Sequence, residues 1–416
     1  MVAMNDKNII VIGGGPSGMM AAIRASELGC RVVLLEKNTE LGKKLLLTGK
    51  GRCNLTNNLD LESFIKHFSG NGQFLRDAFK NFSKEDLMDF FERRGVKLKT
   101  ERQQRVFPES DKAIDILDAL RRELTKNKVK IIYNSKVDNI ILSNNKITSI
   151  KIIGKKSILC SSVILCTGGV SYAATGSSGE GLEIAEELGH KVVSLRPGLI
   201  GLMTKDKYPK LLQGLPLKNI RITFSNGKKK IISEIGELMF TDFGISGPLV
   251  LTLSGQVVDW LKEGKKVMAF IDLKPALSNA QIDAKFLREF KASPKKGIKY
   301  FLRSMLPQRL IDVFLELSAI KPDKTVSQIT LEERKKLLTL FKALPVEIFK
   351  SRPINMAMIT KGGISLKEIN PRTMESRLIE GLYFAGEIID VDADTGGFNL
   401  QSAFSTGYLA GESVVK

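Results

Sequence analysis

A glycine-rich hexapeptide near the amino terminus has the composition and spacing of a phosphate-binding loop. Its sequence is Gly13-Gly-Gly15-Pro16-Ser17-Gly18, which has the spacing GxGxxG. In such a loop Gly13 makes a tight turn, Gly15 leaves room for a diphosphate, and Gly18 lets a helix pack closely on a strand. A helix that starts here adds unpaired N–H groups and a partial positive charge. These residues, with Pro16 and Ser17, therefore predict a dinucleotide-binding site.

An acidic residue follows the loop at the sequence spacing at which dinucleotide-binding folds place a ribose ligand. Glu36 comes directly after the apolar run Arg31–Leu35, and its carboxylate can accept both ribose hydroxyls. An acid at this place disfavours a 2′-phosphate, because the two negative charges repel each other. We predict that Glu36 and the adjacent Lys37 contact the cofactor.

A second cluster close to the carboxy terminus indicates which dinucleotide binds. A strand-like run ends in Gly386-Glu387, and Thr395-Gly396-Gly397-Phe-Asn399-Leu400 then opens the last helix. FAD proteins of the glutathione-reductase type have a similar late strand and helix. There the acid holds the ribityl chain and the helix N-terminus stabilises negative charge on the flavin pyrimidine. A nicotinamide enzyme does not need this second cradle, so we predict FAD.

Other residues complete the predicted site. The strand end Thr167-Gly168 matches the superfamily's approach to the pyrophosphate or ribityl region, and Val137 lies where this fold places a backbone contact to adenine, although burial in a strand explains it equally well. Lys43 and Lys44 can neutralise a pyrophosphate, or form a solvated pair. The polar loop that follows them also supplies predicted flavin contacts: Arg52, Cys53 and Asn54.

The cysteines and histidines do not predict a metal or a catalytic thiol. The four cysteines Cys30, Cys53, Cys160 and Cys166 form no CxxC pair, and the two histidines cannot complete a zinc site with them. Cys53 has no resolving partner, so we interpret it as a packing residue. We assign no general acid or base, because hydride transfer depends mainly on the flavin.

The elements that must position these residues form a βαβ unit. Asn8–Ile12 and Arg31–Leu35 are short, apolar and β-branched, and Met19–Leu28 has helical spacing up to the stop at Gly29. This order implies a parallel sheet with a right-handed crossover. Further strands are predicted at Lys130–Tyr133, Ile140–Leu142, Ile147–Ile153, Val163–Cys166, Ile359–Leu366 and Leu382–Phe384, helices at Gly72–Arg94, Lys112–Lys126, Gly179–Leu188 and from Gly397 onward, and a loop at Gly42–Asn58.

The pattern changes after His190. Short alternating runs such as Arg221–Phe224 and Val267–Leu273 favour a small antiparallel sheet or barrel, and Asn279–Leu344 is helical and rich in lysine. We predict a discontinuous FAD domain over residues 1–190 and 367–416, a β-barrel-like domain over 191–278 and 345–366, and a helical insertion over 279–344.

Composition limits the remaining possibilities. The chain has 416 residues, 43% of them hydrophobic, and a net charge of +19 from 64 basic and 45 acidic residues. It has no apolar run of the ~18 residues that span a bilayer, so we expect a cytoplasmic protein with no membrane contact. Lysine outnumbers arginine and its pairs are scattered along the sequence. We therefore expect weak, salt-sensitive binding to nucleic acid and no specific nucleic-acid partner.

The motifs together resemble one family, the bacterial BaiN-like (aminoacetone-oxidase-like) FAD-binding proteins, also labelled NAD(FAD)-utilising dehydrogenases. The resemblance covers nearly the whole chain and rests on the loop Gly51-Arg-Cys-Asn-Leu-Thr-Asn57, on Phe240–Pro248, on Thr360–Glu368 and on the run Gly386–Asn399. It implies a discontinuous Rossmann-like FAD domain of the glutathione-reductase type with an inserted β-barrel-like domain and a small helical domain. The chain has Ala393 and Phe398 where the family usually has Gly and Tyr.

The expected function is an FAD-dependent oxidoreductase that passes hydride between a small organic substrate and flavin N5. Oxygen or NAD(P)H is the second partner, and NAD(P)H is expected to bind only transiently. Two alternatives stay open: a flavoenzyme that acts on nucleic acid, such as tRNA modification, and a non-catalytic flavin-bound redox sensor. The sequence does not indicate the oligomeric state.

Overall fold

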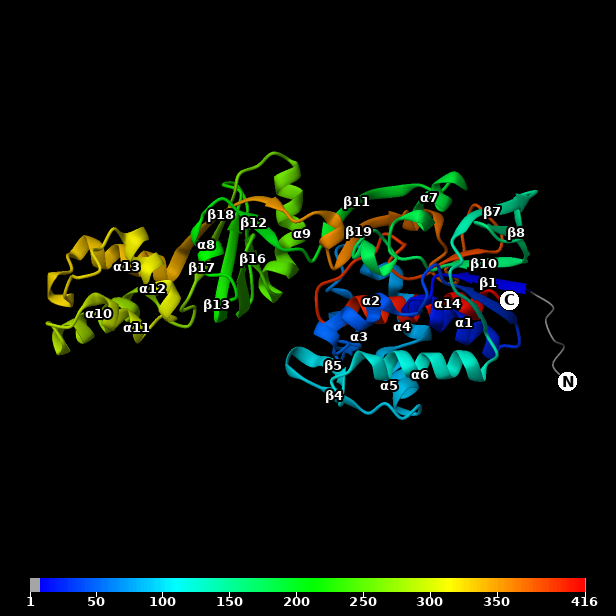
Figure 1. Cartoon of the computed structure of the whole chain (residues 1–416), viewed down its shortest axis with the longest axis horizontal. Helices are drawn as coiled ribbons and strands as arrows, with labels where there is room; N and C mark the ends of the chain where they lie inside the picture. Colours follow the sequence, from blue (N-terminus) through cyan, green and yellow to red (C-terminus); the bar gives the residue numbers. More distant parts are fainter. Residues whose placement is uncertain (1–7, 416) are drawn as a thin grey trace. The chain divides into compact units, whose positions relative to one another are not determined.

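The chain forms two compact units. The computed structural model describes residues 8–415 (Figure 1). The first unit consists of the described residues up to Gly198 and from Ile354 onward, and the second consists of Leu199–Pro353. Each unit has its own cluster of buried apolar side chains.

A five-stranded parallel sheet is the centre of the first unit, with the strand order β20-β10-β1-β2-β6. Its strands are β1 (Asn8–Ile12), β2 (Arg31–Leu35), β6 (Lys130–Ile132), β10 (Ser162–Leu165) and β20 (Leu382–Phe384). β1 and β10 are apolar and almost completely buried, as is typical of parallel strands covered on both faces. The chain proceeds from β1 to β2 on one side and reaches β10 on the other, so β1 marks a switch point at which α/β sheets bind ligands.

Two helices far apart in the sequence pack tightly against each other beside this sheet (Figure 1). They are α1 (Pro16–Glu27) and α14 (Phe398–Ser413). A Cβ atom on Gly407 would overlap the carbonyl of Ser17, and one on Gly411 would lie too close to the carbonyl of Ala21. These two glycines therefore allow the backbones to approach, which brings the last helix to the amino-terminal glycine loop.

The region predicted as one helix over Gly72–Arg94 is broken. The Ser83 hydroxyl caps a new helix by accepting from the Asp86 N–H, and the Asp86 carboxylate accepts in turn from the Ser83 N–H. This capping box fixes a helix start, so the chain turns at Phe82–Ser83 instead of continuing. The predicted loop Gly42–Asn58 likewise contains a short helix, a 3-10 turn and a short strand.

Smaller elements complete the first unit. The helices are α2 (Lys43–Leu47), α3 (Leu61–Ile65), α4 (Arg76–Asn81), α5 (Lys84–Glu92), α6 (Ala113–Lys126) and α7 (Glu180–Glu187). The strands are β3 (Thr56–Asn57), β4 (Leu98–Thr100), β5 (Arg105–Pro108), β7 (Val137–Ser143), β8 (Lys146–Ile152), β9 (Ile158–Leu159), β11 (Val192–Gly198) and β19 (Ile359–Ile364). The 3-10 helices are η1 (Thr48–Gly51), η2 (Gly72–Leu75), η3 (Arg102–Gln104), η4 (Ala173–Thr175), η6 (Ile354–Met356) and η7 (Leu366–Glu368).

The unit boundaries differ from the predicted domain boundaries at 190 and 366. β11 and β19 pair with each other in a separate antiparallel ladder and belong to the first unit. The alternating pattern of residues 191–198 correctly indicates a strand, but it does not reveal which sheet the strand joins, because partner choice depends on contacts distant in sequence.

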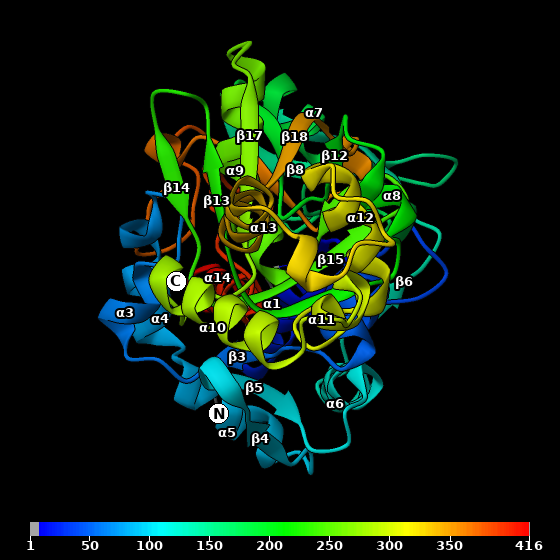
Figure 2. The ribbon, with the colours of Figure 1, turned by 90° about the vertical axis from the view of Figure 1, so that its left-hand side faces the viewer.

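The second unit contains a closed barrel (Figure 2). Its ladder runs β14-β13-β15-β16-β12-β18-β17, and β17 also pairs with β13, which closes the ring. The strands are β12 (Leu202–Thr204), β13 (Pro216–Ser225), β14 (Lys230–Ile232), β15 (Gly236–Thr241), β16 (Gly244–Ser246), β17 (Val267–Asp272) and β18 (Leu344–Ser351).

Helices share the core of this barrel. They are α8 (Tyr208–Leu211), α9 (Pro248–Lys262), α10 (Asn279–Ala292), α11 (Ile298–Arg303), α12 (Gln308–Ser318), α13 (Leu331–Ala343) and the 3-10 helix η5 (Val326–Gln328). One continuous cluster joins barrel residues such as Phe224 to helical residues such as Phe314. α9 was not predicted from the sequence; it is apolar on most sides, so its helical periodicity is weak.

Two kinds of feature are absent from the described residues. None of the helices within residues 8–415 is long and apolar enough to cross a membrane. In the same range, no group of three or more His, Cys, Asp or Glu residues could hold a metal ion.

Candidate functional site

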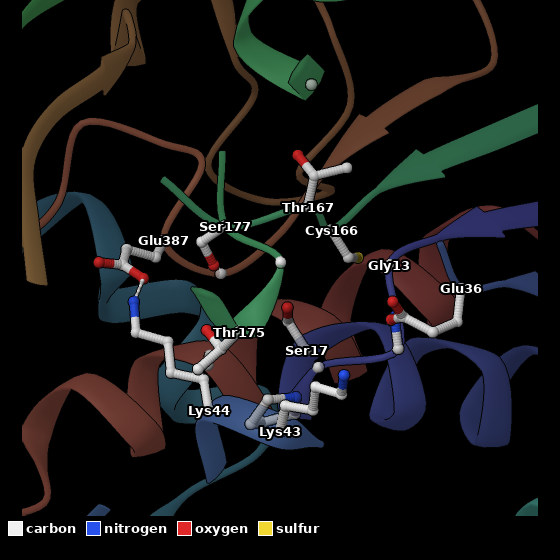
Figure 3. Close-up of a pocket in the computed structure, with 18 of the residues that line it drawn as sticks. Gly13, Ser17, Glu36, Lys43, Lys44, Cys166, Thr167, Thr175, Ser177 and Glu387 are labelled. Atoms are coloured by element: carbon white, nitrogen blue, oxygen red, sulfur yellow. Dashed lines mark hydrogen bonds and ion pairs between the residues drawn. The ribbon is translucent and has the colours of Figure 1, made fainter. Parts of the chain in front are cut away.

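A pocket in the first unit lies where β1, β2 and β10 end and where α1 and α14 begin (Figure 3). Its lining includes Ile12 and Leu35, the last residues of β1 and β2, and Cys166, which follows β10. The pocket is therefore at the switch point of the parallel sheet, where this architecture binds nucleotides.

The three glycines of the loop have a local geometry compatible with a phosphate-binding loop. Gly13 has φ +107°, and a Cβ atom there would lie 2.5 Å from the carbonyl oxygen of Cys166. A Cβ atom on Gly18 would overlap the carbonyl of Gly13, so Gly18 packs the helix against the loop. A Cβ atom on Gly15 meets no protein atom within 4 Å. Gly15 therefore faces open space in the pocket, which is where a ligand would approach the backbone.

Glu36 is buried and organises the loop. Its side chain accepts hydrogen bonds from the Gly14 N–H and from the backbone and amide N–H groups of Asn38, each at 2.8 Å. A carboxylate has about four acceptor positions. One position thus remains for a ribose hydroxyl, and Glu36 has a structural role in addition to the predicted one.

Lys44 lines the pocket and forms an ion pair with an acid that is distant in sequence. Its ammonium lies 2.5 Å from Glu387 Oε2 and 2.7 Å from Ser171 Oγ (Figure 3). Glu387 Oε1 accepts hydrogen bonds from Ser171 Oγ and the Thr360 N–H. Lys44 therefore neutralises the predicted ribityl acid in this structure instead of standing free for a diphosphate.

Lys37 and Lys43 differ in whether their charge is free to meet a ligand. Lys37 forms an ion pair with Glu180 at 2.5 Å. Lys43 has only a long contact of 3.9 Å to Glu40 and lines the pocket. Lys43 is thus the cation best placed to meet a phosphate.

Arg52 does not line the pocket. Its guanidinium pairs with Glu101 and with Asp111 and covers the ring of Phe107 at 4.2 Å. Hydrogen bonds to Glu101 and then Asp111 raise the pKa of Arg52. These acids, from the β4–β5 region and the turn after it, hold the Arg52 side chain outside the pocket, which does not favour the predicted flavin contact.

The rest of the Gly51–Asn57 motif clamps the start of α14. With its amide turned to suit its neighbours, the Asn54 side chain accepts from the Gly397 N–H at 3.1 Å. Asn57 donates to the Gly396 carbonyl at 3.1 Å, and Thr56 Oγ1 donates to Gln401 at 2.6 Å. The two sequence motifs therefore fix each other, and their effect on the pocket is through the position of α14.

Asn399 lines the pocket and also fixes the preceding loop. Its side chain accepts from the Ala393 N–H and donates to the carbonyls of Ala393 and Asp394. Phe398 stacks on His67 at 4.2 Å, and His67 Nδ1 lies 3.0 Å from Asp394. The two residues that depart from the family pattern, Ala393 and Phe398, are thus buried in this packing.

Most predicted site residues come together in the pocket. Those that line it are Gly13, Gly15, Pro16, Ser17, Glu36, Lys37, Lys43, Lys44, Val137, Thr167, Gly168, Gly386, Glu387, Asn399 and Leu400. Those that do not line it are Gly18, Arg52, Cys53, Asn54, Gly396 and Gly397. Apart from Arg52, the second group lies behind the wall and supports it.

One part of the pocket wall was not predicted from the sequence. The segment Thr175-Gly176-Ser177 and Glu180 line the pocket beside the glycine loop. Gly176 has φ +112°, and Asn38 donates to the Thr175 carbonyl at 3.1 Å. A run of Gly and Ser just before a helix was the available signal, but it lacks the GxGxxG spacing.

Cys53 is a packing residue in the structure. It is fully buried, and desolvation raises the pKa of its thiol to about 12. Burial also raises the pKa values of Cys160 and Cys166 to about 12. A thiol at such a pKa remains protonated at neutral pH and is a poor nucleophile.

We therefore expect native protein at pH 8 to react very slowly with iodoacetamide at these three cysteines. Unfolding in guanidinium should make them react within minutes, since the pKa then returns to about 8.5. Mass spectrometry of the alkylated peptides measures this, and Cys53→Ala should retain the wild-type rate of flavin reduction. Rapid alkylation of Cys53 in the native protein would contradict the assignment.

The pocket fits a dinucleotide. The hydroxyl of Thr167 is buried with no partner in the structure, and Thr167 lines the pocket. α1 and α14 both begin without a side-chain cap, so first-turn N–H groups are available at the pocket. Gly15 leaves the space beside one of these helix ends open. Two helix N-termini and a cation suit the charge of a diphosphate and a polar cofactor ring.

Comparison with known proteins decides the family. The model of the HI0933-like protein Rossmann domain matches residues 7–413. The chain belongs to this family. The predicted fold class, the resemblance on which it was based and the assignment as an FAD-dependent oxidoreductase are thereby confirmed.

Three relatives match along the whole chain. The 3-dehydro-bile acid delta(4,6)-reductase of Clostridium scindens is 33% identical, with 98% of each chain covered. The ribosomal RNA dihydrouridine synthases of Haemophilus influenzae and Escherichia coli are 29% and 30% identical, with 97–98% of this chain and of the relatives covered.

Solved structures share the fold at low identity. The 3-ketosteroid delta1-dehydrogenase of Sterolibacterium denitrificans has a TM-score of 0.56 at 12% identity, with 99% of each chain covered. Quinol fumarate reductase of E. coli has a TM-score of 0.51 at 16% identity, with 99% of this chain and 70% of that chain covered.

Proposed function

We propose that this protein reduces a carbon–carbon double bond conjugated to a carbonyl group, with FAD as the hydride carrier. The observation that carries the proposal is the pocket itself, with two uncapped helix N-termini, the open face of Gly15 and the unpartnered Thr167 hydroxyl. The names of the relatives supply the reaction class. A 3-oxo-Δ4,6-steroid and a uracil ring both contain a double bond conjugated to a carbonyl.

In this scheme the chain's own residues bind the cofactor and fix its orientation. When bound, FAD supplies the hydride that chemistry of this kind requires. Lys43 and the first turn of α1 offer positive potential to the diphosphate, and Glu36 offers an acceptor to the ribose. The first turn of α14 offers N–H groups to the pocket, and Lys44 holds Glu387 in a fixed position.

An anaerobic half-reaction tests the proposal. Photoreduced protein should be reoxidised by 2-cyclohexenone or a 3-oxo-Δ4-steroid, with one saturated product formed per flavin. The saturated ketone is the control and should leave the flavin reduced. If neither enones nor uridine-containing RNA reoxidise the flavin, while a hydroxylated or amino substrate reduces the oxidised enzyme, the proposal is wrong.

A small organic substrate is the first candidate, and a uridine within RNA is the second. The second candidate is favoured by the distribution of charge: residues 199–353 contain 28 Lys and Arg against 15 Asp and Glu, a net charge of +13 out of +19. Mass spectrometry of RNA nucleosides after incubation with reduced enzyme distinguishes the two, because dihydrouridine is 2 Da heavier than uridine.

We expect NAD(P)H to be a poor electron donor. In the described residues the only parallel sheet with a glycine fingerprint is the one that binds FAD, and the second unit is a barrel with helices. NADH and NADPH must then meet the flavin without a nucleotide fold of their own, so binding should be weak. Anaerobic stopped-flow reduction should give rates that rise with NAD(P)H concentration and do not saturate in the low micromolar range. Fast reduction with saturation in that range would contradict this.

A further inference from the structure

The positive charge of the protein is concentrated in its second unit. Residues 199–353 have a net charge of +13, whereas the remaining 261 residues have a net charge of only +6. Four of the six runs of adjacent lysines lie in this unit: Lys228–Lys230, Lys265–Lys266, Lys295–Lys296 and Lys335–Lys336.

Strand register brings three of these lysine groups to one end of the barrel. Ser225 pairs with Lys230 on β14 and with Met268 on β17, and Met268 pairs with Glu347 on β18. Beyond this row lie the β13–β14 turn with Lys228 and Lys229, then Lys265 and Lys266 before β17, and Phe349 and Lys350 on β18. Figure 2 shows the two turns at the same end of the barrel.

Charges from both turns act on one carboxylate. The pKa of Glu263, which follows α9, is lowered first by Lys265 and also by Lys229. Within residues 8–415, Lys228, Lys229, Lys230 and Lys350 are exposed and form no ion pair with the protein. Their charge is therefore available to a partner.

An aromatic ring lies among these lysines. Ile348 and Val267 fill the barrel core, so Phe349 and Lys266, one residue along, point to the outer side. Phe349 is 43% exposed. Lys266 itself pairs with Glu347 at 3.6 Å, so the free positive charge at this end of the barrel comes from Lys228, Lys229, Lys230 and Lys350. An exposed ring at the same end of the barrel as these cations suits a polyanion that also has flat bases.

We propose that this lysine face, made of Lys228, Lys229, Lys230, Lys266, Phe349 and Lys350, binds single-stranded RNA. The lysines contact phosphates and Phe349 stacks on a base. For the reaction that follows binding, the inference rests on the second candidate of the proposed function, a uridine within RNA. The binding itself does not depend on the redox step.

The test is fluorescence anisotropy of a labelled 20-nucleotide uridine-rich RNA with the FAD-loaded full chain at 150 mM salt. The variant K228E/K229E/K230E should bind at least tenfold more weakly. It should also lower the slope of log K against log salt by about 2, since each phosphate contact on a single strand contributes about 0.7. The matched control K80E/K97E/K156E makes the same charge change at exposed lysines of the first unit and should alter the affinity less than threefold.

A second pair of variants examines the ring. Phe349→Ala should weaken RNA binding several-fold, whereas Leu211→Ala, which removes another exposed apolar side chain of the same unit, should not.

Equal losses of RNA affinity in both triple-lysine variants, or binding to vesicles of phosphatidylglycerol in place of RNA, would overturn the inference. Loss of RNA binding at the face with enone reduction retained supports it; enone reduction without any RNA binding refutes it and leaves the proposed reaction intact. RNA binding at the face without any reduction would refute the reaction alone.

Discussion

Gly15→Val should fold normally and bind FAD about 100-fold more weakly than the wild type. Gly15 has an ordinary extended conformation, and a side chain there meets no protein atom within 4 Å. The new side chain would instead occupy the space beside the first turn of α1, where the diphosphate must lie. A steric loss of about 3 kcal/mol corresponds to about 100-fold in Kd. Titration of apoprotein with FAD, followed by flavin fluorescence, measures this.

Gly18→Ala is the informative comparison. The added methyl overlaps the carbonyl of Gly13, so the change disturbs packing between helix and loop. We expect Gly18→Ala to lower the thermal unfolding midpoint of the apoprotein, and Gly15→Val to leave it within a few degrees of wild type. If Gly15→Val bound FAD with wild-type affinity, the glycine loop would not be the diphosphate site.

Gly397→Ala should destabilise the protein and weaken FAD binding together. Gly397 has φ +100°, and an added Cβ atom would overlap the carbonyl of Thr56. The left-handed conformation costs an alanine about 1–2 kcal/mol, and overpacking against backbone costs about 1–3 kcal/mol more. Because Gly397 begins α14, relief of the overlap must move the helix start that lines the pocket. Urea unfolding and FAD titration measure the two effects.

Gly189→Ala separates strain from overlap. Gly189 has φ +90°, but a Cβ atom there meets nothing within 4 Å. In this variant the free energy of unfolding should fall only by the cost of the left-handed conformation, about 1–2 kcal/mol. The affinity for FAD should not change. Equal losses at Gly397 and Gly189 would show that the contact between the Gly51–Asn57 loop and α14 contributes nothing.

The βαβ unit and its glycine loop could be predicted from the sequence because they are local. Strand, turn and helix lie within about 30 residues. For this reason Glu36 lies at the end of β2, and Gly18 packs the helix against Gly13 as its spacing predicts. Gly13 also approaches the Cys166 carbonyl, which is distant in sequence. The late Gly386-Glu387 pair lines the same pocket, and its contact with the cofactor stays a prediction.

The roles of charged side chains could not be predicted in the same way. Lys44 pairs with Glu387, which is 343 residues away, and Arg52 pairs with Glu101 and Asp111. A charged group takes the nearest opposite charge in space, and sequence spacing gives no measure of that distance. Lys44 therefore acts on Glu387, and Arg52 lies outside the pocket.

The positions of the Gly51–Asn57 loop and of the barrel lysines also depend on contacts between residues that are distant in sequence. The sequence by itself determined the dinucleotide fold, the FAD cradle and the presence of a second unit, because these depend on periodicity and on short-range glycine turns. Only the tertiary structure decided that Asn54 and Asn57 hold α14, and that Lys228 and Lys266 lie at one end of the barrel. Those arrangements depend on which strands pair and which backbones meet, and such long-range contacts become definite only when the whole chain has packed.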